Sequence, residues 1–323
     1  MSRPDHPERN HMIRILLYLM ATLFLTQTAM AQKAGVGAWE NSRNTTLEWI
    51  EDRPGLEWYY NWRPDQMWHK GGVSRTVEFV PMIHNAGDVN KSIVSTRRAK
   101  ALLGFNEPDR NNGSHQAGLS VDKAIALWPK LEKRGLRLGS PATTQDETLG
   151  RGSWQQRFMA EADRRGLRVD FMAVHYYSTN GDVAAFRNWL QAVHSAYGRP
   201  IWVTEFAMID WARPGAVTYE QNAKFAESAI AMMETLPFVE RHAWFAANPY
   251  PWNGQAPRIN LVDKNLNPTP VGLAFDKVLT RLGGSRVAAG TRETTPQTAT
   301  RLNTAPTLSL PAVQKKRFSK ETR

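Results

Sequence analysis

At residues 102–109 the chain reads Leu102-Leu103-Gly104-Phe105-Asn106-Glu107-Pro108-Asp109, an apolar run that ends in a glutamate. An ionisable group that closes an apolar run is costly unless it is paired or used. Residues 200–206 repeat the pattern as Pro200-Ile201-Trp202-Val203-Thr204-Glu205-Phe206, with a turn signal before the run and a helical pattern after it. Both runs predict strands, and each strand carries a carboxylate, Glu107 or Glu205, to its end.

Six further β-rich segments lie on either side of these two runs. The eight expected strands are Gly35–Trp39, Glu57–Trp62, Val77–His84, Ala101–Glu107, Leu136–Pro141, Val169–Tyr177, Ile201–Phe206 and Arg241–Ala246. Helical patterns lie near residues 43–52, 88–98, 120–134, 152–166, 182–197, 219–236 and 268–282, and residues 63–76 look irregular. Pro129 is expected to kink or break the third helix. Ser153 with Gln156 and Thr218 with Gln221 have capping-box spacing, and Gly135 and Gly166 stand where helix C-caps belong.

The alternation of strands and helices predicts an α/β fold with a parallel sheet. Residues 32–283 are close to the ~250 residues typical of a (β/α)8 barrel, so we expect a single-domain TIM barrel. An open doubly wound sheet is the second reading. That reading lacks support because no Gly-x-Gly-x-x-Gly follows the first strand.

The two ends of the chain differ from this central part. Residues 1–31 combine three arginines, an apolar stretch from Ile15 to Leu25 and the sequence Ala29-Met30-Ala31, which together predict a signal peptide cleaved after Ala31. A retained N-terminal anchor is the alternative. The apolar stretch is short for a membrane span, so we expect no stable membrane insertion after cleavage. Without cysteines the chain has no disulfides, which fits a secreted or periplasmic bacterial protein.

The net charge of +11 is concentrated at the C-terminus. Residues 284–323 carry eight Lys or Arg against two Glu, while residues 32–283 keep only +4. This small charge gives no reason to expect a nucleic-acid partner. The segment 284–323 has no apolar periodicity, so we expect a disordered basic tail.

Barrel enzymes carry their chemistry at the carboxyl ends of the strands. The polar and aromatic residues at the expected ends are Trp39, Glu40, Asn61, Trp62, His84, Asn85, Asn106, Glu107, His175, Tyr176, Tyr177, Glu205 and Trp244. Aromatic faces with amides, phenols and imidazoles suit a sugar chain, and two strand-end glutamates make a glycosidase the leading hypothesis. A metal site of His84, His175 and His242 is a poor alternative because no His-x-His or His-Glu-x-x-His spacing occurs. We therefore expect neither a metal nor another cofactor.

Three motifs resemble the alkali-sensitive-linkage-type glycosyl hydrolase catalytic domain, family 128 of the glycoside hydrolases in clan A. They are Gly104-Phe105-Asn106-Glu107-Pro108-Asp109, Val174-His175-Tyr176-Tyr177 and Trp202-Val203-Thr204-Glu205-Phe206. Supporting matches are Tyr60-Asn61-Trp62, Val80-Pro81-Met82, Leu261-Val262-Asp263, Leu266 and Thr269-Pro270-Val271-Gly272. Departures are His84 and Tyr176, which stand where Trp is expected or common.

The resemblance implies a retaining β-glucanase, usually acting on β-1,3-glucan, with Glu107 as acid/base and Glu205 as nucleophile. Asn106 is expected to bond the sugar 2-hydroxyl. Trp62, His84, His175, Tyr177 and Trp244 are expected to bind substrate. A tyrosine of the Tyr176-Tyr177 pair would hold Glu205 ionised and leave Glu107 with the raised pKa. We expect a monomer whose partner is a β-glucan polysaccharide or oligosaccharide. The alternatives are a non-catalytic glycan-binding barrel and a hydrolase of another β-linked polysaccharide.

Overall fold

The computed structural model describes residues 33–68, 75–111, 113–252 and 254–290 of the 323-residue chain. The predicted signal peptide at 1–31 lies outside the described residues, as does the tail from residue 291. Among the described helices, none combines the length and apolar character needed to cross a membrane.

All eight predicted strands are present in the part of the chain that the structure describes. They are β1 (Ala34–Gly37), β2 (Trp58–Tyr60), β3 (Glu78–Phe79), β4 (Ala101–Leu102), β5 (Arg137–Leu138), β6 (Met172–Ser178), β7 (Ile201–Met208) and β8 (Val239–Phe245). Six strands form a parallel sheet in the order β3-β2-β1-β8-β7-β6, and β4 pairs in parallel with β5. Parallel bridges Met82–Leu103 and Gly139–Phe171 join the two sheets beyond the ends of the named strands. The strands therefore close into a ring, which confirms the barrel and excludes the open sheet.

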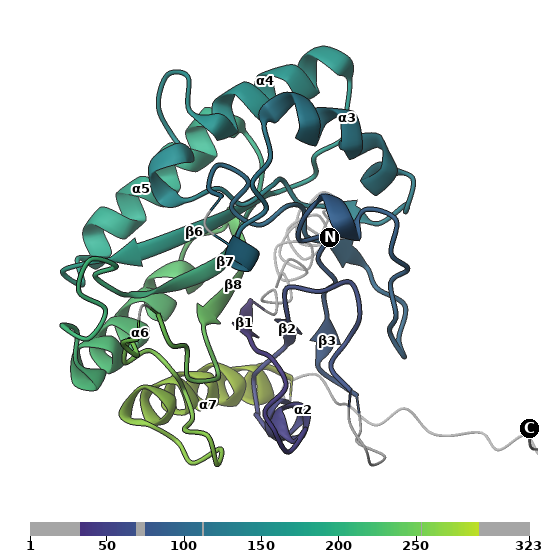
Figure 1. The fold of residues 1–323 in the computed structure, drawn as a ribbon. Helices are drawn as coiled ribbons and strands as arrows, with labels where there is room; N and C mark the ends of the chain where they lie inside the picture. The colour runs from purple at the N-terminus through teal and green to yellow at the C-terminus, as the bar shows by residue number, and fades with distance from the viewer. Residues whose placement is uncertain (1–32, 69–74, 112, 253, 291–323) are drawn as a thin grey trace, which may run out of the picture.

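Helices surround the strands on the outside of this ring (Figure 1). They are α2 (Thr46–Glu51), α3 (Val121–Glu132), α4 (Trp154–Arg165), α5 (Val183–Tyr197), α6 (Tyr219–Glu234) and α7 (Pro270–Gly290), with 3-10 turns η1 (Ala86–Asp88), η2 (Gly113–His115) and η3 (Gln145–Glu147). The predicted start signals act locally. Thr218 and Gln221 form a full capping box at α6, and the Ser153 side chain accepts from the Gln156 amide at α4. Gly166 ends α4 with φ 66°.

The structure differs from the expected elements at three points. Residues 88–98 form η1 and turns instead of a helix, because the Val94 carbonyl accepts from the Gln66 amide and the Thr96 amide donates to the Gln66 side chain. Pro129 does not break α3, which continues to Glu132. Helix α7 continues to Gly290, past the boundary placed at residue 283, so the end of the barrel domain stays a prediction.

Large aromatic side chains fill the barrel below the strand ends. Trp202 packs on Phe171 with ring centroids 4.1 Å apart and on Trp58 at 5.5 Å, and all three are buried. Gly35 makes room for this layer, since a Cβ there would stand 2.3 Å from the Trp58 ring. The interior is thus a packed core, and open space is left at the carboxyl ends of the strands.

Candidate active site

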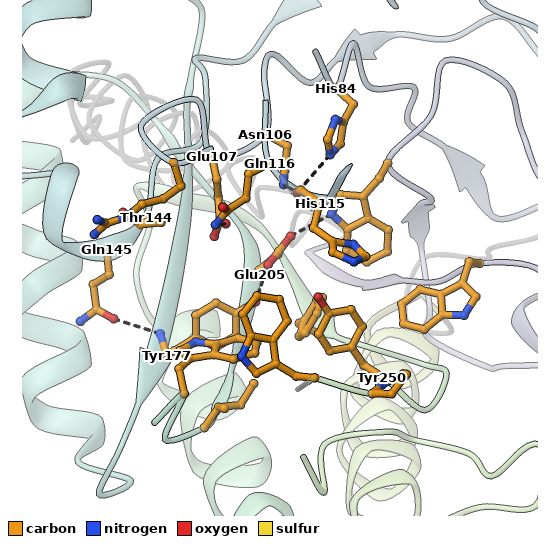
Figure 2. Close-up of a pocket in the computed structure, with 18 of the residues that line it drawn as sticks. His84, Asn106, Glu107, His115, Gln116, Thr144, Gln145, Tyr177, Glu205 and Tyr250 are labelled. Atoms are coloured by element: carbon orange, nitrogen blue, oxygen red, sulfur yellow. Dashed lines mark hydrogen bonds between the residues drawn. The ribbon is translucent and has the colours of Figure 1, made fainter. Parts of the chain in front are cut away.

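A cavity of about 1010 Å³ opens at the carboxyl ends of the strands. Residues that follow each of the eight strands line it, from Trp39 after β1 to Trp252 after β8. Six of the eight predicted site residues are among the lining residues, namely Trp62, His84, Asn106, Glu107, Tyr177 and Glu205. Figure 2 shows Glu205 near the centre of this group, with Glu107 and Tyr177 close to it.

Glu205 points from β7 into the barrel and is held by three side chains. The Trp62 indole N–H donates to Oε1 at 2.8 Å, and the Tyr177 hydroxyl donates to Oε2. The Tyr60 hydroxyl lies 3.4 Å from Oε1 and also donates to the Thr204 carbonyl at 2.9 Å. Tyr60 and Trp62 stand two residues apart along β2 and its extension, so both face the interior. The Glu205 side chain is only 5% exposed, and its orientation is fixed before any ligand binds.

Glu107 follows β4 and lines the same cavity as Glu205. The Gln116 amide donates to its Oε2 at 2.7 Å, and His175 Nδ1 lies 3.0 Å from its Oε1. The Glu107 side chain is 16% exposed, more than that of Glu205. Carboxylate oxygens of Glu107 and Glu205 lie within 4.8 Å of each other and of a His175 ring nitrogen. Because the two carboxyl groups lie so close inside one cavity, the protonation of each affects the pKa of the other.

The pKa values of the three groups shift in directions that their contacts explain. Burial raises the pKa of Glu205, and the charge of Glu107 raises it further against the opposing effect of His175. Burial also acts to raise the pKa of Glu107, but the hydrogen bond and charge of His175 outweigh it and hold that pKa below its usual value. Burial acts to lower the pKa of His175, but the two carboxylates raise it. The prediction that Glu107 has the raised pKa is therefore wrong for the free protein, because an imidazole lies against it.

Two residues of the site adopt a left-handed backbone conformation that side chains disfavour. Trp62 has φ 56° and Glu107 has φ 40°. Such residues cost on the order of 1–3 kcal/mol each and gather at functional sites. Gly37 leaves room for the Trp62 ring, since a Cβ there would lie 2.5 Å from it. The sequence held no signal for this strain.

His84 and Asn106 hold a loop rather than standing free in the cavity. The His115 carbonyl accepts from Asn106 Nδ2 at 3.0 Å and lies 3.2 Å from His84 Nε2. The His115 ring lies edge-on to Tyr250 and Trp252, at centroid distances of 5.8 and 6.4 Å. Strands β4 and β8 stand opposite each other in the ring, so the loop after β4 reaches the loop after β8 across the mouth of the barrel.

An aromatic wall, formed by Trp211, Tyr250 and Trp252, lines the cavity beyond the two glutamates. Trp211 and Trp252 meet edge to face at 5.4 Å, and Tyr250 stacks beside Trp252 at 6.2 Å. The sequence reading missed Trp211, Tyr250 and the loop residues His115 and Gln116. These residues lie well beyond their strand ends, where no strand pattern points to them.

Two predicted substrate contacts are corrected. Trp244 is fully buried outside the cavity, and its indole N–H donates to the Ile259 carbonyl at 2.7 Å. His175 is also 0% exposed and lies behind the carboxylates, out of reach of a ligand. His84, His175 and His242 do not form one group, because His242, in the middle of β8, has its Nε2 3.0 Å from Glu234.

The chain is similar to known proteins over most of the barrel. Residues 36–275 match the family described as the glycosyl hydrolase catalytic core. A subgroup I endo-β-1,3-glucanase of family GH128 from Amycolatopsis mediterranei, solved with laminaritriose, is 32% identical, with a TM-score of 0.64 over 76% of this chain and 99% of that one. A subgroup II endo-β-1,3-glucanase of the same family from Sorangium cellulosum is 26% identical, with a TM-score of 0.61 over 76% and 98%.

A curated relative matches over a shorter stretch. Alkali-sensitive linkage protein 1 of Schizosaccharomyces pombe is 30% identical over 200 residues, which are 59% of this chain and 34% of that protein. This chain thus spans about a third of the length of the yeast protein. With the family match covering the barrel and both glutamates in its cavity, the chain belongs to the glycosyl hydrolase catalytic core family, within family 128, and is a glycoside hydrolase.

Proposed function

We propose that this protein is a retaining endo-β-1,3-glucanase with Glu107 as acid/base and Glu205 as nucleophile. The observation that carries the proposal is the carboxylate separation. An oxygen of Glu107 and one of Glu205 lie within 4.8 Å. Retaining glycosidases keep their carboxyl groups ~5–5.5 Å apart, whereas inverting ones leave ~6.5–9.5 Å for a water molecule. The spacing here is that of a retaining pair and is shorter than that of an inverting pair.

The surroundings of each glutamate support its assigned role. Glu205 is fixed by donors from Trp62 and Tyr177, as an attacking carboxylate must be to reach the anomeric carbon. Glu107 is the more exposed of the two and borders the open cavity, where a leaving-group oxygen can approach it. Attack by Glu205 with proton donation from Glu107 gives a covalent glycosyl-enzyme. Glu107 then removes a proton from the water that hydrolyses this ester.

Asn106 supplies a polar atom for the sugar beside this pair. Its Oδ1 is buried at the cavity wall without a hydrogen-bond partner in the described part of the chain, while its Nδ2 holds His115. An unpaired acceptor of this kind is costly unless a ligand satisfies it. We assign this oxygen to a sugar hydroxyl, and by the resemblance to the 2-hydroxyl, where such bonds tighten in the transition state.

Two features favour a β-1,3-glucan as substrate. The aromatic wall offers flat faces for pyranose rings. The similar proteins from Amycolatopsis and Sorangium are endo-β-1,3-glucanases. We further propose that the barrel acts as a monomer after export, with residues 1–31 removed as a signal peptide and with a secreted or periplasmic location. These last points rest on the sequence alone.

The test uses a panel of β-1,3-, β-1,4- and mixed-linkage glucans, with Glu205→Gln as the matched inactive control. We expect hydrolysis of the β-1,3 polymer into a series of oligosaccharides, with products released first as the β-anomer by proton NMR. Preferred cleavage of another polymer would support a glycoside hydrolase but would contradict the proposed substrate. Binding without cleavage by the wild-type chain would favour the glycan-binding alternative. Initial α-anomer would contradict retention.

A further inference from the structure

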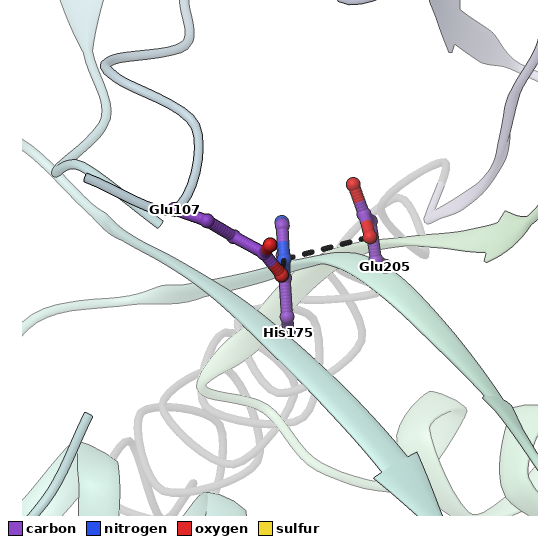
Figure 3. Close-up of side chains that lie close together, drawn as sticks. All are labelled: Glu107, His175 and Glu205. Carbon is purple, nitrogen blue, oxygen red and sulfur yellow. Dashed lines mark hydrogen bonds and ion pairs between the residues drawn. The ribbon is translucent and has the colours of Figure 1, made fainter. Parts of the chain in front are cut away.

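His175 occupies a position between the two catalytic glutamates that the proposed mechanism leaves unused. On the parallel pair β6 and β7, the Cα of His175 is in register with that of Glu205. Its Nδ1 lies 3.0 Å from Glu107 Oε1 and 3.5 Å from Glu205 Oε2. Figure 3 shows the His175 side chain between the two carboxylates. The ring is 0% exposed, so it touches neither substrate nor solvent. Whatever His175 does must pass through the two carboxylates.

The surroundings of His175 are acidic on each side that carries a titratable group. Glu107 and Asp109 face it from the segment after β4, and Glu205 faces it from β7. The hydroxyls of Tyr177, on the same strand, and Tyr60, on β2, point to Glu205. An imidazolium carries a hydrogen on each ring nitrogen, and Nδ1 is the nitrogen with acceptors, because Nε2 has no partner among the described residues. Nδ1 is therefore the atom that holds a hydrogen against Glu107.

We propose that His175 stores the proton that Glu107 delivers to the leaving group. This inference rests on the proposed function. In the transfer, the Nδ1–H bond breaks and an O–H bond forms at Glu107 Oε1. The imidazolium becomes a neutral imidazole with its hydrogen on Nε2, and the Glu107 carboxylate becomes the acid. The hydrogen bond between the two atoms survives with donor and acceptor exchanged. His175 is thus a positioning residue that acts through Glu107.

This arrangement keeps the charge of a buried site constant. Imidazolium with two carboxylates carries −1, and neutral imidazole with one carboxylic acid and one carboxylate also carries −1. After glycosylation Glu205 is an uncharged ester and Glu107 a carboxylate, so the sum is unchanged. Altering the net charge of buried side chains is expensive, so a proton store within hydrogen-bond reach lowers that cost. It also explains how a Glu107 that is ionised in the free protein acts as an acid.

The first test is the pH profile of kcat/KM for His175→Asn on laminarihexaose. Asparagine places an amide N–H near the Nδ1 position but holds no titratable proton. If His175 stores the proton, the alkaline limb of the kcat/KM profile of this variant shifts to lower pH by about 1 unit or more. The matched control is His194→Asn on α5, where the lost histidine bonds the Arg199 carbonyl outside the cavity lining, and its limb stays at the wild-type pH. A uniform loss of rate with unmoved limbs would reduce His175 to a structural hydrogen bond and overturn the proposal.

The second test reads the proton without turnover. Imidazole nitrogen shifts of the full-length protein should show His175 protonated at neutral pH. Its pKa should fall once a 2-deoxy-2-fluoro-laminaribiosyl donor has esterified Glu205, because the Glu205 charge that raises it is gone. A neutral His175 in a protein that does hydrolyse β-1,3-glucan contradicts the proton store alone. A protonated His175 in a protein that cleaves no glucan contradicts the proposed function instead.

Discussion

The Trp62 indole N–H donates to Glu205 Oε1 at 2.8 Å, which ties the segment after β2 to strand β7 across the barrel interior. This bond joins a residue with left-handed backbone to a carboxylate that is 5% exposed. Hydrogen bonds to a charged group are worth about 1.5–3 kcal/mol, so the indole favours the ionised form of Glu205. The strain at Trp62 is thereby put to chemical use.

Trp62→Phe is expected to raise the acid limb of the kcat/KM profile by about 1 pH unit, because the ionised form of Glu205 loses a donor. Trp39→Phe is the matched control. Trp39 also lines the cavity and lies 5.8 Å from the Trp62 ring, but it donates no hydrogen bond to Glu205. Equal shifts in both variants would assign the effect to lost packing.

Glu205→Gln is expected to stabilise the fold at neutral pH. Burial raises the Glu205 pKa above its unfolded value, so the favourable protonated state is complete below the unfolded pKa and lost as pH rises through the folded one. The variant removes that loss. The melting temperature of the variant should match that of the wild type near pH 4 and exceed it at pH 7. Each kcal/mol gained in the free energy of unfolding raises the melting temperature by about 2–4 °C.

Glu161→Gln is the control, because the pKa of Glu161 is shifted in the opposite direction to that of Glu205. Hydrogen bonds from Arg164 and Arg165 lower the pKa of this carboxyl to about 2. Its contribution is present above the unfolded pKa, so the variant should gain nothing at any pH. A lower melting temperature for Glu205→Gln at pH 7 would mean that the donors of Trp62 and Tyr177 outweigh burial.

The aromatic wall gives a prediction about binding. Trp252→Ala should raise KM for laminarihexaose by about 2–10-fold with little change in kcat, since stacking on an unreacting ring binds substrate and transition state alike. The control is Trp68→Ala, a tryptophan that is 57% exposed and outside the cavity lining. A fall in kcat with unchanged KM would place Trp252 at the reacting sugar instead.

The sequence predicted the fold and the site correctly where a local pattern repeats. Eight β-rich runs gave eight strands, and Glu107 and Glu205 were found because each closes such a run. His115, Gln116 and Trp211 were missed because the loops that carry them have no period. Trp244 was misjudged for a related reason. Residues alternate in facing along β8, and sequence does not say which alternate set faces the barrel interior. The contacts of His175 with Glu107 and Glu205 join three segments that only the closed barrel brings together.

The C-terminal segment allows a test of the domain boundary. A chain ending after Gly290 keeps all of α7, whose buried side chains Val271, Phe275, Val278 and Leu279 pack on the barrel. We expect unchanged melting temperature and unchanged turnover of soluble oligosaccharide, because no described core residue is removed. A chain ending after Gly283 shortens the helix and serves as the comparison. A large loss of stability in the longer variant would show that residues 291–323 contribute to the fold.

The proposed roles of Glu107 and Glu205 can be told apart by what restores activity after each is replaced by alanine. Glu205→Ala removes the attacking group, so hydrolysis should fall by several orders of magnitude on every substrate. Glu107→Ala removes proton donation, which an activated aryl glycoside hardly needs, so its glycosylation should survive far better than cleavage of glucan.

Added azide then reports the face of attack. In Glu107→Ala it opens the covalent intermediate and yields a β-glycosyl azide, whereas in Glu205→Ala it attacks directly and yields the α product. The reverse stereochemistry would exchange the two roles, and wild-type activity in both variants would end the catalytic assignment.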